Sequence, residues 1–467
     1  MIKRKFINLL NKIVPMKHIK NSTLVVLLLV LIIASCKKQY KPIEVTSEDF
    51  HKSVDKVIEV MVHDIFSPPV ASRIFAYPNI AAYEIIAQHN DNYNSLVGQV
   101  KDLSEIPSAD ISKPVNYQLA ALIAHIDLSR RLIFSEDMIK SYRDSLYHIW
   151  ENINPTEFNA SKEYGLQVAD FIGAWMDKDN YKQTRTMSKF TVISDDPGRW
   201  QPTPPAYMDG IEPHWNKIRT FVIDSASQFK PVPAYSYSME KKSNFYKDLI
   251  EVYDVGNEIT KKGDSSDEVQ IAQFWDCNPY VSVTRGHLMF ATKKITPGAH
   301  WIGIAKIACR KTNADFDKSI FVYTKTSMAL ADAFISAWDE KYRSNLVRPE
   351  TLINSSIDDS WKPLLQTPPF PEYVSAHSVV SGAAAMALTS IFGDNFKFDD
   401  DTELRFGIPV RSFNSFNEAS AEAAISRLYG GIHYRAAVEH GLTQGINLGE
   451  FEVRKLKMLK TDKTATN

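Results

Sequence analysis

The chain has 467 residues, of which 44% are hydrophobic, and it carries 54 basic against 55 acidic side chains. A chain of this length and composition can bury one large core or two smaller ones. The formal net charge of −1 provides no basic excess for sequence-independent binding to nucleic acid, so nucleic acid is not an expected partner.

The N-terminal 35 residues have the pattern of a secretory signal. Several lysines precede an apolar run from Leu24 to Ala34, which is too short to span a bilayer as a helix but matches the hydrophobic region of a signal peptide. The run ends in Ile33-Ala34-Ser35-Cys36, which resembles the lipobox of bacterial lipoproteins, whose cysteine is acylated and becomes the mature N-terminus. We therefore expect residues 1–35 to be a lipoprotein signal peptide and residues 36–49 to be a tether.

This prediction places the chain in the bacterial cell envelope, at the periplasmic face or the cell surface. Acyl chains on Cys36 would hold it on a membrane, since each buried methylene contributes about 0.8 kcal/mol. An uncleaved anchor with an incidental cysteine is the alternative. Cys277 and Cys309 would lie in a compartment that permits a disulfide, and two buried free thiols fit the sequence equally well.

From about residue 50 onward the pattern is mainly helical. Apolar side chains recur at helical spacing near residues 50 to 66, 116 to 150 and 320 to 342, and alternating strand patterns are scarce. Prolines and aromatic residues interrupt this pattern between about 180 and 240, which predicts a long loop region. Such a loop either packs over or near a pocket or is an insertion on the outside of a helical bundle. The expected regions are 50–320 (N-terminal helical), 321–460 (catalytic helical) and 461–467 (disordered tail).

The first chemical motif runs from Lys341 to Arg348-Pro349, at the end of a helical stretch. Because a proline disfavours helix at the residue before it, we expect the chain to turn at Arg348 and to free that side chain to point inward. Taken alone, such a pair of cations is more often a solvated helix face.

The second motif is Val374-Ser375-Ala376-His377, followed by a run of small residues. Ser375 is a good N-cap residue, so a helix should begin here. A helix N-terminus offers free N–H groups and a partial positive charge to an oxyanion, and His377 would lie in its first turn. Taken alone, the motif is an ordinary cap with a partly buried histidine.

The third motif is Ser426-Arg427 followed by Gly430-Gly431 and His433. Paired glycines are poor helix formers, so we expect them to end a helix and to let Arg427 and His433 converge. A plain loop between two helices is the alternative.

Together, Lys-x6-Arg-Pro, Ser-x-His and Ser-Arg-x5-His resemble the signature of the superfamily of type 2 phosphatidic acid phosphatases and vanadium-dependent haloperoxidases. The match covers residues 341 to 441. The stretches 67 to 77 and 296 to 301 are similar to bacterial haloperoxidase-like members. The resemblance implies a mainly α-helical bundle.

The resemblance also implies a role for each motif residue. Lys341, Arg348 and Arg427 would bind the equatorial oxygens of vanadate or phosphate, and forked guanidinium donors suit such tetrahedral anions. Ser375 and the backbone N–H of Ala376 would add hydrogen bonds. His377 would be the acid–base residue, and His433 the axial vanadium ligand or the phosphatase nucleophile.

Two departures from the family pattern bear on the chemistry. Ala376 stands where the family often has glycine, and its methyl group narrows the approach of the anion. Phosphatases tend to have an aspartate four residues after the axial histidine, where this chain has Ala437; Glu439 or a distant carboxylate would have to replace it. The second departure favours a haloperoxidase.

The leading hypothesis is thus an enzyme that holds vanadate as cofactor and uses peroxide to oxidise halide. A cofactor-free phosphatase acting on a phosphoester through phosphohistidine is the runner-up. A catalytically silent surface binding lipoprotein belongs to a different class. Zinc hydrolysis is disfavoured because no His-Glu-x-x-His or clustered Cys/His spacing is present. The sequence leaves the halide and a homo-oligomeric state open.

Overall fold

The computed structural model describes residues 40–460 except for 280–281, 286–287 and 292. Most helices begin at residue types that the sequence marks as helix starts. Ser, Asn, Thr or Asp side chains cap the helices at Asn116, Ser243, Thr296, Asp315 and Ser415 by accepting a backbone N–H. The described α-helices are α3 (Ser47–Asp64), α4 (Pro68–His89), α5 (Tyr117–Arg130), α6 (Glu136–Ile153), α7 (Pro155–Met176), α8 (Tyr181–Thr184), α9 (Asn244–Lys262), α10 (Asp267–Phe274), α11 (Pro297–Lys311), α12 (Phe316–Ser344), α13 (Pro349–Ser356), α14 (Ala376–Phe392), α15 (Phe416–Tyr429) and α16 (Arg435–Lys455).

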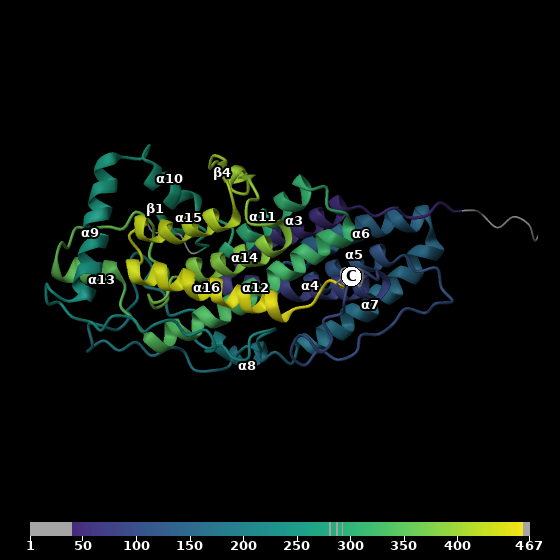
Figure 1. Ribbon diagram of the computed structural model, residues 1–467, viewed down its shortest axis with the longest axis horizontal. Helices are drawn as coiled ribbons and strands as arrows, with labels where there is room; N and C mark the ends of the chain where they lie inside the picture. The colour runs from purple at the N-terminus through teal and green to yellow at the C-terminus, as the bar shows by residue number, and fades with distance from the viewer. Residues whose placement is uncertain (1–39, 280–281, 286–287, 292, 461–467) are drawn as a thin grey trace, which may run out of the picture. The chain divides into compact units, whose positions relative to one another are not determined.

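Helix α12 is the central element of residues 43–460. It has 29 residues, which corresponds to about 44 Å, and almost every position from Ser319 to Trp338 is buried. Helices α4, α11, α14 and α16 pack around it, and Figure 1 shows α12, α14 and α16 running side by side. A helix buried on all sides needs apolar or small residues all round, which explains the run of alanine, serine and threonine along α12.

Strands form only a small part of the described residues. β1 (Ser282–Arg285) pairs with β2 (Leu288–Ala291) as an antiparallel hairpin. β3 (Phe398–Asp400) pairs with β4 (Arg411–Phe413), with Phe398 opposite Phe413 and Asp400 opposite Arg411. The expected mainly α-helical fold is confirmed.

The ordered fold begins earlier than the expected boundary at residue 50. Helix α3 starts at Ser47, where Thr46 and Asp49 form a capping box, and Ile43 lies in the core with 2% of its surface exposed. The C-terminal part of the expected tether is therefore packed, because Ile43 contributes apolar surface to the core. The expected signal peptide, Cys36 and the tail 461–467 lie outside the described residues.

The proline- and aromatic-rich segment contains no α-helix between α8 and α9, and only the 3₁₀ helix η1 (Trp215–Lys217). Its tryptophans Trp200 and Trp215 are fully buried, so part of the segment packs into the interior, whereas Tyr207 and Val232 are exposed. The backbone N–H of Trp200 donates to the carbonyl of Asn345 at 3.0 Å, and Val347 N–H donates to Gly198 at 3.0 Å. The segment thus packs along the end of α12.

Cys277 and Cys309 are both buried free thiols. Of the two alternatives that the sequence left open, the structure has the unpaired one. Among the described helices, none combines the length and apolar character needed to cross a bilayer.

Candidate active site

Arg348 is positioned by the break between α12 and α13. Asn345 ends α12 in a left-handed conformation, and Arg348 is the extended N-cap of α13, as the proline after it predicts. The guanidinium is fully buried: Nε donates to the carbonyl of Phe370 at 3.0 Å, and Nη1 donates to the carbonyl of Ile432 at 2.8 Å. Nη2 has no partner among the described residues.

His433 lies in the loop between α15 and α16. Gly431, whose φ of +75° suits glycine, lets the chain turn there. His433 Nδ1 is 2.7 Å from Oε1 of Glu372, and Nε2 is 3.1 Å from Nη1 of Arg348. Since the guanidinium can only donate, Nε2 is the acceptor and Nδ1 carries the proton. The ring therefore keeps a lone pair on Nε2.

Burial and nearby cations keep this histidine neutral. Burial, followed by the charges of Arg348 and Lys341, lowers the pKa of His433 well below its usual value. Burial raises the pKa of Glu372 to about 7, although Arg348 and Lys341 oppose that shift. Oε1 of Glu372 also accepts the backbone N–H of Tyr434 at 3.0 Å, which fixes the carboxylate against the loop.

The second motif forms the helix start that its sequence predicts. Ser375 is the N-cap of α14, and its hydroxyl accepts the N–H of Ser378 at 3.3 Å. Ala376 is the first residue of the helix, and His377 follows in the first turn. The His377 ring donates to the backbone of Trp275, and its Nε2 has no partner among the described residues. Burial, reinforced by the charge of Arg427, lowers the pKa of His377 well below its usual value.

Arg427 comes from the last turn of α15 and points back into the molecule. Its Nη1 donates to the carbonyl of Trp275 at 2.9 Å, the carbonyl that also receives the His377 ring. Nε of Arg427 has no partner among the described residues. The side chain is fully buried, and this burial lowers the pKa of its guanidinium.

Lys341 lies differently from its expected role. Its ammonium donates to the carbonyls of Pro371, Glu372 and Val374 at 3.1, 3.0 and 2.5 Å. These three bonds use all three of its donors, and Lys341 does not line the cavity described next. In this structure Lys341 ties down the loop that presents Glu372 and Ser375, and a direct contact of Lys341 with an anion stays a prediction.

A small cavity lies between the second and third motifs, and Arg348 of the first motif contacts the lining residue His433 without lining the cavity itself. Its lining includes one residue or more from each of the second and third motifs and Pro68 from the start of α4; the lining residues are Pro68, Cys277, Asn278, Pro368, Phe370, Ala376, His377, Arg427, Ile432 and His433. A wider open cleft of about 790 Å³ between α3, α6 and α11 shares none of them. Residues of the proline-rich segment 185–243 do not line the cavity either.

The unpartnered atoms around this cavity define what it can hold. A buried N–H without a partner costs about 1 to 3 kcal/mol, and here Nη2 of Arg348 and Nε of Arg427 are both left over. Such guanidinium donors suit a small tetrahedral oxyanion, and the Nε2 lone pairs of the two neutral imidazoles can act as a ligand or take up a proton. The donor set therefore fits vanadate or phosphate.

Two parts of the site have no role in the motif analysis. Glu372 lies two residues before the second motif, and its adjacency to His433 depends on how residues 371–374 fold. Glu372 is the distant carboxylate that contacts the histidine in place of the aspartate that phosphatases tend to have at the position of Ala437. Glu439 instead pairs with Arg435 at the surface. The carbonyl of Trp275 is the second part. It could not be recognised from the sequence, because every residue type has a main-chain carbonyl.

The fold and the cavity define a class of mainly α-helical proteins that bind an oxyanion between buried cations and histidines. Comparison with protein-family models matches residues 321–461 to the VCPO second helical-bundle domain, the region that contains all three motifs. No curated protein matches the chain.

Solved structures narrow the class. The chain is 68% identical to a protein described as the first bacterial vanadium-dependent iodoperoxidase, over 91% of this chain and 100% of that one, with a TM-score of 0.88. Holo and apo structures of a bacterial vanadium-dependent chloroperoxidase share the fold at 14% and 15% identity, over 89% and 86% of this chain and 98% and 97% of theirs, with TM-scores of 0.65 and 0.64. This chain belongs to the vanadium-dependent haloperoxidase family, as its motifs predict.

Proposed function

We propose that this chain is a vanadium-dependent iodoperoxidase that binds vanadate in the cavity lined by His377, Arg427 and His433, with Arg348 beside His433. The observation that carries the proposal is the set of buried, unpartnered donors around that cavity. The 68% identity to an iodoperoxidase supports iodide as the halide. The overall reaction, H₂O₂ + I⁻ + H⁺ → HOI + H₂O, consumes one proton, so the site needs a group that moves protons.

The buried side chains have separate tasks in this proposal. Nη2 of Arg348 and Nε of Arg427 donate to oxygens of the anion and compensate its charge. His433 would offer the lone pair of Nε2, because the proton is fixed on Nδ1 by Glu372; vanadate would take the place of Arg348 Nη1, which this lone pair accepts from in the structure. When bound, vanadate supplies a Lewis-acidic centre that activates hydrogen peroxide towards halide.

His377 is the proposed proton carrier. Trp275 holds one ring nitrogen, and Nε2 faces the cavity with a lone pair, so it can take a proton from an incoming acid and return it to a leaving oxygen. The anion's negative charge would offset Arg427 and move the pKa of His377 back towards its usual range.

Vanadate binding and iodide oxidation on one preparation test the proposal. The vanadate-loaded chain should oxidise iodide with peroxide and should process bromide more slowly. Arg427→Ala should weaken vanadate affinity about 10- to 100-fold, because a hydrogen bond to a charged group contributes about 1.5 to 3 kcal/mol. Arg435→Ala, at a half-exposed arginine paired with Glu251, is the matched control and should behave as the parent.

Other outcomes have distinct meanings. His433→Ala should abolish vanadate coordination, and His377→Ala should reduce turnover more than affinity. Hydrolysis of p-nitrophenyl phosphate without any iodide oxidation would replace the proposal by the phosphatase reading. Absence of both activities in a vanadate-binding protein would favour a silent binding lipoprotein.

We also propose that the mature chain is a lipoprotein of the bacterial envelope, anchored through Cys36. The support is the apolar run followed by Ile33-Ala34-Ser35-Cys36. Metabolic labelling with a palmitate analogue should label the parent and its Cys309→Ser variant. Cys36→Ser should lose both the label and membrane fractionation, and a label that survives this substitution would contradict the anchor.

A further inference from the structure

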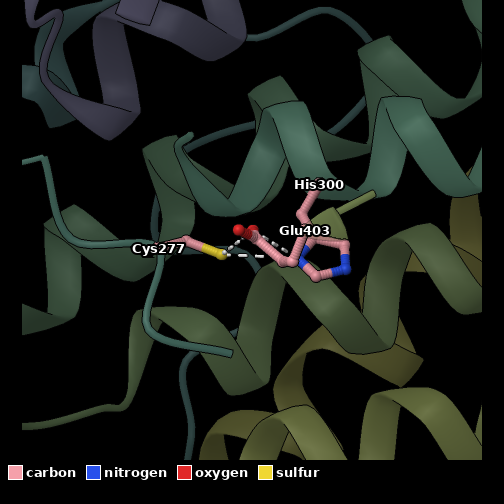
Figure 2. Close-up of side chains that lie close together, drawn as sticks. All are labelled: Cys277, His300 and Glu403. Atoms are coloured by element: carbon pink, nitrogen blue, oxygen red, sulfur yellow. Dashed lines mark hydrogen bonds and ion pairs between the residues drawn. The ribbon is translucent and has the colours of Figure 1, made fainter. Parts of the chain in front are cut away.

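Three buried side chains meet behind the wall of the vanadate cavity. Cys277 follows α10, His300 lies in the first turn of α11, and Glu403 follows β3. Their ligand-type atoms Sγ, Nδ1 and Oε1 lie close together (Figure 2). His300 is fully buried and the other two are nearly so, so these polar atoms have little contact with water.

The separations of these atoms match the edges of a coordination tetrahedron. Cys277 Sγ is 3.4 Å from His300 Nδ1 and 3.8 Å from Glu403 Oε1, and Nδ1 is 3.4 Å from Oε1. Zinc bound at about 2.3 Å to sulfur and about 2.0 Å to nitrogen and oxygen gives tetrahedral edges of about 3.3 to 3.6 Å. One ion fits between the three atoms with shifts of a few tenths of an ångström.

The two nitrogens of His300 have different surroundings, which is a separate observation. Nε2 is 2.9 Å from Asp400 Oδ2, an ordinary hydrogen bond. Nδ1 is 3.4 Å from Glu403 Oε1, which is longer than the 2.7 to 3.2 Å typical of N–H···O bonds. A ring that donates one N–H to a carboxylate while its other nitrogen faces a thiol and a second carboxylate has the arrangement of a metal-ligating histidine.

Asp400 is itself fixed in place. Its Oδ1 accepts the backbone N–H of Thr402 at 3.0 Å, which shapes the turn that carries Glu403. Trp275 stacks on the His300 ring, with centroids 4.5 Å apart. The stacking with Trp275 and the bond from Nε2 to Asp400 therefore fix the orientation of the imidazole. Nδ1 is the ring nitrogen that can bind an ion.

We propose that Cys277, His300 and Glu403 bind a divalent transition-metal ion, with zinc as the best match to one sulfur, one nitrogen and one oxygen ligand. Binding displaces the proton of the Cys277 thiol and any proton on His300 Nδ1, while Nε2–H keeps its bond to Asp400. Each displaced proton leaves to solvent, and no electron is transferred. A fourth position remains for water or a small anion.

The proposed ion would stabilise the wall of the active site. Cys277 lines the vanadate cavity, and the neighbouring Trp275 carbonyl holds Arg427 and His377. An ion that ties Cys277 to α11 would also keep that carbonyl in place. Binding this ion does not depend on vanadate, so the two sites can be tested separately.

Metal analysis of the purified full chain is the first test. After chelation and incubation with Zn²⁺, the parent should retain about one zinc per chain whether or not vanadate is present. Cys277→Ser should lose that zinc, and Asp400→Asn should weaken its affinity about 10- to 100-fold. Cys309→Ser is the matched control, since Cys309 is the other buried thiol and lies outside the cluster; it should retain the zinc.

Cobalt substitution is the second test, and its main readout is taken on the parent protein. Co²⁺ should give a thiolate-to-cobalt charge-transfer band together with the intense visible absorption of a four-coordinate site. That band should be absent in Cys277→Ser and present in Cys309→Ser. Parent protein without the band, or equal zinc in the parent and Cys277→Ser, overturns the proposal and leaves a proton-sharing cluster.

Discussion

Glu372 shows how one buried carboxylate sets the chemistry of a histidine. Its Oε1 accepts from Nδ1 of His433, which leaves Nε2 with its lone pair beside Arg348. Its negative charge also compensates Arg348 and Lys341, both of which are fully buried. Removing that charge should therefore affect the tautomer of His433 and the net charge of the whole site.

We expect Glu372→Gln to lower vanadate affinity about 10- to 100-fold, because partners of this kind tune the basicity of a ligating histidine. Equilibrium titration followed by ⁵¹V NMR measures the loss. Glu439→Gln is the control, since Glu439 lies on the surface beside Arg435. Equal affinities in the parent and Glu372→Gln would remove Glu372 from this role.

His125 allows a pH prediction outside the active site. It is buried in α5, where its Nδ1 contacts the hydroxyl of Ser53 at 2.8 Å, and burial lowers its pKa to about 3. The unfolded chain protonates this histidine near pH 6.5, so between pH 6.5 and 4 the unfolded state binds more protons and stability falls as the pH falls. The contribution is about 1.4 kcal/mol per pH unit.

Urea unfolding of the parent and of His125→Gln at several pH values measures this contribution. The free energy of unfolding of the parent, minus that of the variant, should shrink by about 1.4 kcal/mol for each unit below pH 6. Two curves that run parallel from pH 7 to pH 5 would show that His125 is not held neutral by burial.

At the scale of elements, the close approach of α14 and α16 positions the second motif. Gly382, Gly441, Gly445 and Gly449 lie at their contact, and a Cβ on Gly445 would lie 2.0 Å from the carbonyl oxygen of Val379. No side chain fits there unless the two backbones separate. The first turn of α14, with His377, moves with any such separation.

Gly445→Ala should therefore cost about 1 to 3 kcal/mol of folding free energy, in spite of alanine's higher helix propensity. Gly173→Ala in α7 is the control, because its added Cβ meets only side-chain atoms at 3.4 Å or more. It should be neutral or should stabilise the protein by up to about 1 kcal/mol. Thermal unfolding distinguishes the two, and similar melting temperatures would contradict the packing argument.

The contrast between local and long-range features explains what the sequence could predict. Helix starts at Ser375 and Pro349 and the glycine break at Gly430 depend on neighbouring residues only, so the motifs alone indicated them. The bond between Glu372 and His433 and the meeting of Cys277 with Glu403 join residues 61 and 126 positions apart. Such contacts depend on the packing of α10, α11 and α14 and leave no trace in local spacing. The lysine of the first motif was placed on the anion by resemblance, and only its side-chain contacts revealed the bonds to the loop 371–374.

At the scale of the whole described chain, one buried carboxylate of α12 fixes residues 221–223 of the long segment before α9. Asp332 Oδ1 accepts the N–H of Phe221 at 2.7 Å, and Oδ2 accepts those of Val222 and Ile223 at 2.7 and 3.0 Å. Asp332 is fully buried, so these donors have no water to replace it. Asp332 thus fixes residues 221–223, while other side chains of α12 bind Ile211 and Asn216 of the same segment.

Asp332→Asn should cost about 1 to 3 kcal/mol, because an amide nitrogen cannot accept and one or more N–H groups lose their partner. Amide hydrogen exchange should become faster at residues 221–223. Asp339→Asn on the same helix, at a partly exposed carboxylate that pairs with Arg343 and accepts the Asn216 side-chain amide, is the control for residues 221–223; it should leave their exchange unchanged and cost less than about 1 kcal/mol. Unchanged exchange at 221–223 in Asp332→Asn would show that the segment is held elsewhere.

The carbonyl of Trp275 has a consequence for how this protein can vary. It receives both Arg427 and His377, yet it belongs to the main chain, so no point substitution deletes it. Replacement of the indole would alter the stacking on His300 while the oxygen persists. Substitutions at position 275 can therefore disturb the alignment of Arg427 and His377 only indirectly, by shifting the peptide plane. We expect such substitutions to reduce activity in part, whereas loss of the His433 side chain should abolish it.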